Sequence, residues 1–554
     1  MSMFCFQCQE AARGTGCSTI GVCGKSESTA QLQDAVMEIA RGVSIYSAAY
    51  ISEEYSNHQP MIPVGALAWI KKALFSTITN ANFDDSALEQ VIYDGLAWRL
   101  EIQQLCINND ISVPQANEHA AKWCPTTTLE ILSEHEVISV LREFNSDPDT
   151  SSLRELVTYG LKGFAAYLHH AAELGFEDSE CNNFLIRTLA HTSNSDLDLS
   201  FMTSLAMEVG AHGVKAMALL DQANTVSFGE PRSTQVNLGV GIRPGILVSG
   251  HDLSDLAKLL EQSKDSGIDI YTHCEMLPAH AYPLFQSYPH LVGNYGNAWW
   301  NQNQEFTSFH GPILFTTNCI VPPPKNATYI DKVFTTGAAG FPGYKHIVTN
   351  EAGEKDFSEI IKLAHHCLPP QKIEEGYITI GFAHSQIEAI SSEILEAINK
   401  GYLKKFVVMA GCDGRHSQRS EYTNTASSLP NDSVILTAGC AKFRYNKLDL
   451  GSITIDGTCS IPRLLDAGQC NDSFSLVKTA ILLKNAFNLD NINDLPIEYN
   501  IAWYEQKAII VLLSLLHLGI KNIKLGPTLP SFLTHGVRKL LLKEFGLHSL
   551  EPMH

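Results

Sequence analysis

From Val236 onward the sequence repeats one order of segments. A short run rich in β-branched residues comes first, a turn containing glycine follows it, and a helical pattern comes next. This order is typical of α/β architecture, because parallel strands need a long crossover connection and a helix usually supplies it. The predicted strands cover residues 245–248, 268–271, 313–317, 377–380, 406–409, 434–437 and 523–525.

The first 230 or so residues have a different pattern, in which apolar residues recur at intervals of three and four. Such spacing predicts helices, here over residues 29–55, 85–106, 153–168 and 201–220. Ser152 and Glu155 form a candidate capping box for the third of these helices. A helical bundle is therefore expected at the N-terminus.

These patterns predict an α/β multidomain protein, in which a helical-bundle domain precedes two Rossmann-like domains with mostly parallel sheets. A chain of 554 residues is too long for one hydrophobic core, so several domains are expected. Because Pro369 and Pro370 interrupt the α/β part, the predicted domains are 1–235, 236–370 and 371–554.

Composition excludes several classes of partner. The formal net charge of −20 disfavours binding to nucleic acid or to an anionic membrane surface. The longest apolar run, residues 508–516, is far shorter than the roughly 20 residues of a transmembrane helix. The first residues lack the basic and apolar pattern of a signal peptide, which predicts a cytoplasmic protein. In that reducing compartment, the 14 cysteines favour metal ligation or catalysis over disulfides.

Four cysteines near the N-terminus have the spacing C-x2-C-x8-C-x5-C. Four thiolates on a short loop can surround one metal centre, and soft sulfur donors suit either zinc or an iron–sulfur cluster. The spacing therefore predicts a metal site and leaves the metal open. This quartet consists of Cys5, Cys8, Cys17 and Cys23.

A second group of candidate ligands follows the predicted strands. In an open α/β sheet, ligands bind outside the carboxyl ends of the strands, so side chains far apart in sequence can converge there. A single cysteine at a strand end is more often a small buried core residue, but several at the same place indicate a metal site. The residues at these ends are His251, Glu275, Cys319, Cys412 and Cys440, and Cys470 closes a sixth unit of the same kind that begins at Leu465.

The donor types constrain the chemistry of this second group. Imidazole, carboxylate and thiolate together mix hard and soft ligands, which points to more than one metal atom. Alternation along a strand would place His273 on the same face as Glu275, where it would orient the carboxylate or simply be a core histidine. The sequence has no G-x-x-x-x-G-K-[ST], H-E-x-x-H or G-x-S-x-G motif, so nucleotide hydrolysis, zinc proteolysis and serine hydrolysis have no support.

At these residues the sequence closely resembles the hybrid cluster proteins, also called prismane proteins and known as hydroxylamine reductases. The matching motifs occur in the same order along nearly the whole chain. They are FCFQCQE (4–10), VSGHDL (248–253), THCEMLP (272–278), TTNC (316–319), MAGCDG (409–414), TAGC (437–440), DAGQCND (466–472) and WYEQK (503–507).

The resemblance implies a helical domain and two α/β domains around a hybrid [4Fe–2S–2O] cluster. It implies seven ligands to that cluster, with a persulfide on Cys412, and a [4Fe–4S] cluster on the N-terminal quartet. Cys274 departs from the family, because a glycine is expected beside the carried-over glutamate. The implied ligands are His251, Glu275, Cys319, Cys412, Cys440, Cys470 and Glu505.

The activity implied by the resemblance is reduction of small nitrogen oxides in nitrosative stress: hydroxylamine to ammonia and water, and nitric oxide to nitrous oxide. Electrons from an unidentified donor protein would enter through the N-terminal cluster. Three alternatives remain at this point: a carbon monoxide dehydrogenase, a nitric oxide sensor that passes nitrosyl groups through Cys412, and a zinc-stapled binding module. The candidate proton donors are Glu275, Glu505, His251 and Lys507.

Overall fold

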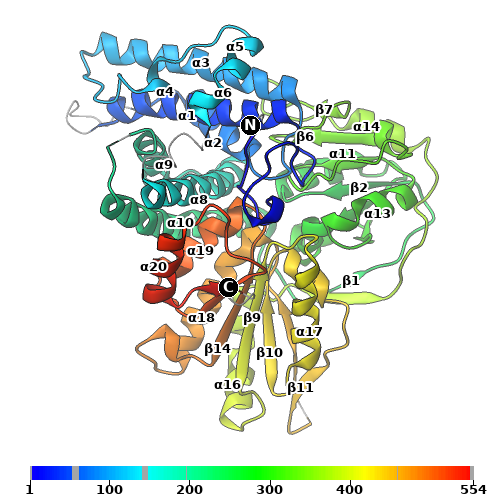
Figure 1. Ribbon diagram of the computed structural model, residues 1–554. Coiled ribbons are helices and arrows are strands. Elements are labelled where there is room, and N and C mark those ends of the chain that lie inside the picture. The colour runs from blue at the N-terminus through cyan, green and yellow to red at the C-terminus, as the bar shows by residue number, and fades with distance from the viewer. Residues whose placement is uncertain (1–2, 53–60, 140–146, 195, 458, 550–554) are drawn as a thin grey trace.

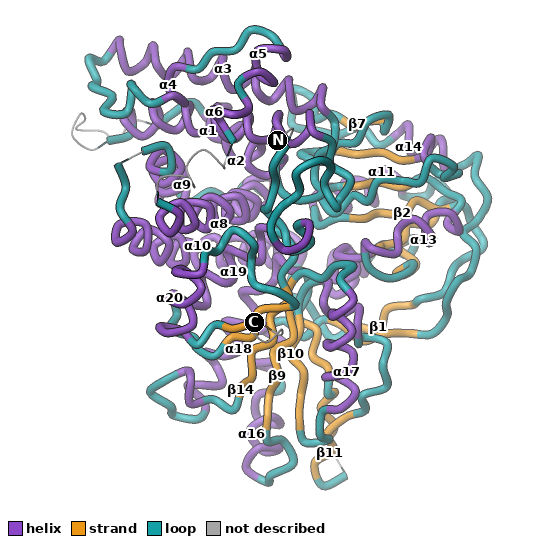
Figure 2. The backbone as a smooth tube through the Cα atoms, in the orientation of Figure 1, coloured by secondary structure: helices purple, strands orange, loops and turns teal. Residues whose placement is uncertain are grey.

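The computed structural model describes residues 3–52, 61–139, 147–194, 196–457 and 459–549. Helices make up the first part of the chain, and sheets covered by helices make up the rest (Figures 1 and 2). The helices of the first part are α1 (Glu27–Tyr50), α2 (Val64–Ser76), α3 (Asp85–Asn108), α4 (His119–Lys122), α5 (Thr128–Ser133), α6 (His135–Ile138), α8 (Pro148–Glu173), α9 (Ser179–His191) and α10 (Leu199–Phe228).

The four helices predicted in this part are present. Helix α1 ends at Tyr50, and residues 53–55 of the predicted 29–55 helix lie outside the described residues. Helix α8 begins earlier than predicted. Its N-cap is Asp147, whose carboxylate accepts hydrogen bonds from the backbone N–H groups of Asp149 and Thr150. Pro148 follows at the first helical position, where no N–H is needed. The predicted cap residue Ser152 lies inside the helix and donates its hydroxyl to the Phe532 carbonyl at 2.8 Å. The predicted capping box is therefore wrong.

The first of two large sheets has six parallel strands in the order β4-β3-β2-β5-β6-β7. Helices lie on both of its faces: α11 and α14 pack on one face and α13 on the other (Figure 1). Its strands are β2 (Gly245–Ser249), β3 (Asp269–His273), β4 (Leu291–Asn294), β5 (Ile313–Phe315), β6 (Val333–Thr336) and β7 (Lys345–Ile347). Its helices are α11 (Leu253–Ser263), α12 (Pro283–Gln286), α13 (Gln302–Phe309) and α14 (Ser358–Ala364).

The second large sheet also has six parallel strands, in the order β13-β10-β9-β14-β15-β16. Its strands are β9 (Lys405–Gly411), β10 (Ser433–Thr437), β13 (Leu464–Asp466), β14 (Ile497–Ala502), β15 (Ile523–Gly526) and β16 (His548–Ser549). The helices of this region are α15 (His384–Ala389), α16 (Ser391–Asn399), α17 (Ser420–Ser428), α18 (Ser473–Ala486), α19 (Gln506–His517) and α20 (His535–Phe545).

Two smaller antiparallel pairs complete the sheets: β1 (Thr234–Asn237) with β8 (Tyr377–Ile380), and β11 (Ser452–Ile455) with β12 (Cys459–Pro462). The strand predicted at residues 377–380 is thus present, but it belongs to neither parallel sheet. Its side chains alternate between exposed and buried, as expected for a strand with one solvent face, whereas β2 and β3 are buried throughout. The α/β fold class is confirmed, and the domain division at residues 235 and 370 stays a prediction.

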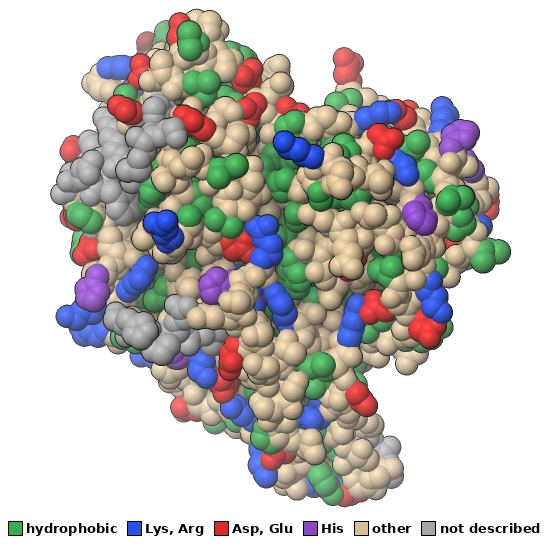
Figure 3. All heavy atoms as spheres, turned by 45° about the vertical axis from the view of Figure 1, so that its right-hand side comes forward, with side chains coloured by type: hydrophobic (Ala, Val, Ile, Leu, Met, Phe, Trp, Pro, Cys, Tyr) green, Lys and Arg blue, Asp and Glu red, His purple; other side chains and the backbone are tan. Residues whose placement is uncertain are grey.

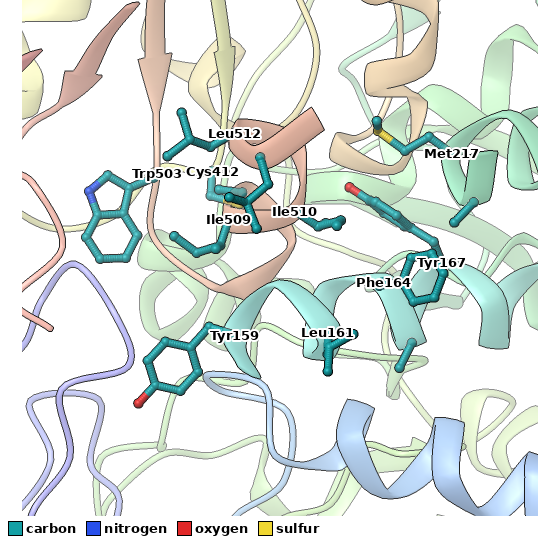
Figure 4. Packing of buried hydrophobic residues seen from close by; sticks show 14 of the residues in the cluster. Tyr159, Leu161, Phe164, Tyr167, Met217, Cys412, Trp503, Ile509, Ile510 and Leu512 are labelled. Atoms are coloured by element: carbon teal, nitrogen blue, oxygen red, sulfur yellow. The ribbon is translucent and has the colours of Figure 1, made fainter. Parts of the chain in front are cut away.

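Helix α19 connects the second sheet to the helical part, because it packs against α8 and α10. Glycines allow the close approach: a Cβ at Gly163 would lie 2.6 Å from the Gln506 carbonyl oxygen, and one at Gly210 would lie 2.2 Å from that of Leu513. Figure 4 shows the cluster in which α8 and α19 pack, with Cys412 among its members. The start of α19 is therefore held in place by the helical bundle.

A buried ion pair holds the loop that follows β13. Lys442 is fully buried, and its ammonium donates to Asp466 Oδ1 and to the Gly468 carbonyl, both at 2.5 Å. Lys442→Met should leave a buried carboxylate without its partner, which costs about 3–5 kcal/mol. We expect the midpoint of denaturant unfolding to fall clearly in this variant.

Lys404→Met is the matched control, because Lys404 pairs with Asp432 on the surface and is 67% exposed. It should change the free energy of unfolding by less than about 1 kcal/mol. Equal effects of the two variants would contradict a structural role for the Lys442 pair.

The surface is mixed in charge, and acidic and basic side chains are interspersed over the face shown in Figure 3. Within the described part of the chain, every helix is too short or too polar to cross a membrane. The predicted cytoplasmic location stays a prediction.

Candidate functional site

The strand order of each large sheet reverses at one point. In the first sheet the chain moves from β2 outward to β3 and β4 and then returns to place β5 on the other side of β2. In the second sheet the reversal lies between β9 and β14. Ligands of open α/β sheets bind at such switch points, outside the carboxyl ends of the strands. His251 and Cys319 follow β2 and β5, and Cys412 and Glu505 follow β9 and β14.

Three further donors follow the neighbouring strands and lie in short 3-10 helices. Glu275 is in η3 (Cys274–Ala281) after β3, whereas Cys440 begins η7 (Cys440–Arg444) after β10 and Cys470 begins η8 (Cys470–Asp472) after β13. All seven residues line one cavity between the two sheets, and each is at most 9% exposed. The structure therefore brings together every residue predicted for this group.

The imidazole of His251 is oriented by Thr317. The Thr317 hydroxyl donates to the Asn318 carbonyl at 3.1 Å, so it accepts from His251 Nδ1, which lies 2.8 Å away. This bond places the proton on Nδ1 and leaves Nε2 with a free lone pair, 3.9 Å from Glu275 Oε2. Burial lowers the pKa of His251 well below its usual value, and the Lys507 ammonium lowers it further. His251 is therefore a neutral imidazole with Nε2 available for a metal.

Removing the Thr317 hydroxyl should weaken any metal bound at His251. Thr317→Val keeps the shape of the side chain but no longer fixes the tautomer, and such changes typically cost 10- to 100-fold in metal affinity. The measurement is retention of iron against a competing chelator. Thr335→Val is the matched control, because Thr335 makes the same kind of bond to His346 Nδ1, at 3.0 Å, away from the cavity. A loss of iron in both variants alike would contradict this role.

Glu275 has one oxygen held by the protein and one free. Its Oε2 accepts a 2.7 Å hydrogen bond from the backbone N–H of Cys470, which lies on the other sheet. Its Oε1 has no hydrogen-bond partner among the described residues although the side chain is buried. Ligand atoms of His251, Glu275 and Cys470 all lie within 4.8 Å of one another. A buried carboxylate oxygen without a partner is costly, and a bound cation would satisfy it.

Glu505 is the N-cap of α19, and its Oε2 accepts the backbone N–H of Lys507 at 2.8 Å. The other oxygen, Oε1, lies 3.6 Å from Cys412 Sγ and 3.8 Å from Lys507 Nζ. Burial raises the pKa of Glu505, and the Lys507 ammonium offsets part of that effect. Lys507 is fully buried, and its Nζ has no hydrogen-bond partner among the described residues.

Three thiols of the cavity have raised pKa values. Burial raises the pKa of Cys319 and of Cys440, and neighbouring thiols and carboxylates add to the effect. The pKa of Cys412 is raised by its contact with Cys470 and by burial. Although burial alone would lower the pKa of Lys507, the surrounding thiols and Glu505 raise it. The positive charge of the Lys507 ammonium is too small to balance all of these acidic groups if they ionise. Bound metal cations would supply further positive charge and would deprotonate the thiols on binding.

The donor set therefore fits a cluster of several metal atoms. Thiolates suit iron bound with sulfide, whereas carboxylate and imidazole suit iron with harder ligands, and all of these donors are present in one cavity. Two ion pairs hold the loop after Cys412, since the buried Asp413 carboxylate pairs with Arg419 at 2.8 Å and with Arg444 at 2.5 Å.

The N-terminal quartet lies in an irregular loop before α1. Cys5 and Cys17 pair through two backbone hydrogen bonds of 3.0 and 2.8 Å, which fold the loop back on itself. Burial raises the pKa of Cys8, and the other three thiols of the quartet raise it further because they lie nearby. The Lys25 ammonium lies 3.8 Å from Cys5 Sγ. The four thiols that were predicted to bind one metal centre therefore lie close to one another.

This loop is attached directly to the buried cavity. The backbone N–H of Gln9 donates to the Tyr504 carbonyl at 3.0 Å, one residue before Glu505. The Arg419 guanidinium donates to Gln9 Oε1 at 2.9 Å, to the Trp503 carbonyl at 2.8 Å and to the Cys412 carbonyl at 3.3 Å. The two groups of donors are therefore parts of one connected structure.

Two results differ from the strand-end pattern of the sequence. Glu505 was absent from that pattern because β14, with Glu498, Tyr499 and Asn500 at its centre, is not apolar enough to be recognised as a buried strand. His273 does not orient Glu275. Its Nε2 bonds Glu305 at 3.0 Å and its Nδ1 bonds Ser249 at 3.1 Å, so it is a satisfied core histidine.

Several proteins named hydroxylamine reductase are similar to this chain over nearly its full length. A hydroxylamine reductase of Clostridium botulinum (strain Kyoto / Type A2) is 49% identical and aligns over 100% of this chain and 98% of its own length. Hydroxylamine reductases of Porphyromonas gingivalis and Acetivibrio thermocellus are each 52% identical; the first aligns over 98% of this chain and 96% of its own length, the second over 99% and 97%.

Solved structures with a similar fold include carbon monoxide dehydrogenase IV from Carboxydothermus hydrogenoformans. It has a TM-score of 0.54 at 16% identity and covers 98% of this chain and 89% of its own. A chain of a solved acetyl-CoA synthase/carbon monoxide dehydrogenase has a TM-score of 0.55 at 14% identity and covers 99% of this chain and 84% of its own. Residues 3–550 match the model of one family, and the chain thus belongs to the Prismane/CO dehydrogenase family.

Proposed function

We propose that this protein is a hydroxylamine reductase, an iron–sulfur oxidoreductase. In the reaction, hydroxylamine takes up two electrons and two protons, its N–O bond breaks, and ammonia and water leave. The observation that carries the proposal is the buried cavity in which one histidine, two glutamates and four cysteines converge from two sheets. Full-length relatives with about half of their residues identical support the same activity.

The two groups of donors would hold different clusters. We assign a [4Fe–4S] cluster to Cys5, Cys8, Cys17 and Cys23, and a hybrid [4Fe–2S–2O] cluster to the seven residues of the cavity, with a persulfide on Cys412. When bound, the hybrid cluster supplies an open iron position that polarises the N–O bond, and the electrons that break it. The orphaned oxygen of Glu275 and the free Nε2 of His251 support this assignment.

The protein's own groups would bind the substrate and supply protons. Lys507 keeps its proton because the acidic groups around it raise its pKa, and its Nζ is free to donate to a substrate oxygen. Glu505, with a pKa raised by burial, lies 3.8 Å away and can return a proton to Lys507 or hold one at Oε1. His251 and Glu275 complete the polar side of the cavity.

An apolar cavity adjoins this site and offers a route for a small uncharged molecule. Val477, Val511 and Leu515 line its far side, whereas Cys412, Cys470 and Lys507 line the side next to the donors. Water and ions are disfavoured in such a lining, but hydroxylamine and nitric oxide are neutral at pH 7. The cavity supports the reduction of small nitrogen oxides as a class.

Electrons would enter through the quartet, from a donor protein that is not identified. The support is positional: the quartet's loop, unlike the cavity, includes exposed residues such as Ile20 and Val22, at 63% and 47% exposure. The same loop is hydrogen-bonded to the backbone of Tyr504, directly before Glu505. A path between the two groups of donors therefore runs entirely through bonded and hydrogen-bonded atoms.

The test is an anaerobic electron paramagnetic resonance titration of iron-loaded protein, followed by assay of ammonia release from hydroxylamine with a chemical reductant. We expect two distinct cluster signals and steady turnover. A protein with a single cubane signal, or one with both signals that releases no ammonia, would contradict the proposal. Nickel in the purified protein, together with oxidation of carbon monoxide, would favour the dehydrogenase instead.

A further inference from the structure

Cys274 is a buried cysteine next to Glu275 and is not one of the seven proposed donors. It follows β3 directly, is 4% exposed, and lines the same cavity as the seven donors. It therefore adds a fifth thiol to a site for which the family resemblance implies four.

The thiol of Cys274 is paired with a proposed cluster ligand from the other sheet. Its Sγ lies 3.6 Å from Sγ of Cys440. Two thiolates on one tetrahedral metal ion, with metal–sulfur bonds of about 2.3 Å, lie roughly 3.8 Å apart. The spacing of the two sulfurs is thus the spacing of two ligands that share one metal.

A second observation points to a ligand in the same cavity. Glu275, the residue next to Cys274, is 2% exposed, and its Oε1 has no hydrogen-bond partner among the described residues. Both side chains line the cavity. Metal ions bound in this cavity would satisfy both the free carboxylate oxygen and the sulfur pair.

The backbone conformation at residue 274 favours glycine over cysteine. Cys274 has φ of +54°, a left-handed conformation that is unfavourable for a residue with a Cβ and costs glycine little. If backbone conformation alone decided the residue at this position, glycine would give the more stable protein. The cysteine carries a cost that a bond to metal would offset.

From this geometry we infer that Cys274 is an additional thiolate ligand of the buried iron site and shares one metal ion with Cys440. This inference rests on the proposed function, because it needs iron in the cavity. Binding converts the Cys274 thiol to a thiolate, and its proton leaves to solvent as the metal enters. The site would then hold iron through five cysteine sulfurs, one histidine and two glutamates.

The test compares wild-type protein with Cys274→Gly and Cys274→Ala, each loaded anaerobically with ⁵⁷Fe. Mössbauer spectra should show that one iron of the buried site loses thiolate character in both variants, with a higher isomer shift, while the signal of the quartet's cluster is unchanged. Cys106→Ala is the matched control, because Cys106 is 2% exposed and bonds the Tyr46 carbonyl, away from both groups of donors. Its spectrum should equal that of the wild type.

Folding is tested separately, by thermal unfolding of the iron-free proteins. Cys274→Gly should be at least as stable as the wild type, since glycine adopts φ of +54° freely, so its spectral change cannot come from misfolding. If the wild type shows both clusters and neither Cys274 variant alters the buried-site spectrum, this inference is overturned and the proposed function stands. If the wild type shows no iron signal from the buried site, the proposed function fails and the inference fails with it.

Discussion

Glu505→Gln is expected to lower hydroxylamine turnover by roughly 10²- to 10⁴-fold, the range typical for loss of a group that takes part in proton transfer. Glutamine keeps an oxygen that can accept the Lys507 backbone N–H, so the cap of α19 is preserved. What it loses is the negative charge beside Cys412 and Lys507, together with the ability to hold a proton.

The measurement is ammonia release under a strong chemical reductant, together with cluster spectra of the same samples. We expect the spectrum of the buried site to change, because an amide is a poorer ligand than a carboxylate, and that of the quartet to stay the same. Glu498→Gln is the matched control, because Glu498 lies on the same strand, β14, and pairs with Lys405 and Lys524 at 2.5 and 2.7 Å. A Glu505→Gln protein with wild-type spectra and turnover would remove Glu505 from both roles.

Cys8→Ala should remove the quartet's cluster and with it the supply of electrons to the buried site. Cys8 is buried among the other three thiols, and a cubane cluster held by three cysteines is less stable than one held by four. We expect iron content to fall by about four atoms per chain and turnover driven by a protein donor to fall to background.

Spectra of the remaining iron distinguish this result from general unfolding. The buried-site signal should persist in Cys8→Ala, because none of its seven donors belongs to the quartet. Cys181→Ala is the control, since Cys181 is fully buried in α9 and should leave both signals and the turnover intact. If Cys8→Ala kept full turnover with a protein donor, the quartet would not be the point of electron entry.

The sequence alone predicted the fold class and most of the site, because these depend on local patterns. Apolar spacing of two and of three to four residues reports which face of a strand or helix is buried, and that spacing located β2, β3, β5, β9 and β10. Residues directly after parallel strands lie at the same edge of the sheet. Six of the seven cavity donors were therefore predicted from the sequence pattern. Family motifs added the seventh, Glu505.

Where the local pattern was weak, the prediction was incomplete or wrong. Strand β14 carries polar residues at its centre, so its end was not recognised from periodicity. The start of α8 was placed at Ser152, because a capping motif inside a helix looks the same in sequence as one at its start. His273 has the right alternation to face Glu275, yet Glu305, 32 residues away in sequence, takes its Nε2.

Tertiary structure decided how the pieces meet. The strand patterns show that donors follow strands, but only the packing of the two sheets brings Cys470 N–H to within 2.7 Å of Glu275 Oε2, and Cys274 Sγ to within 3.6 Å of Cys440 Sγ. Those contacts join residues far apart in sequence, and they depend on long-range burial that no local pattern encodes. The chain by itself therefore determined which donors are present, and the three-dimensional packing determined which of them can share one metal ion.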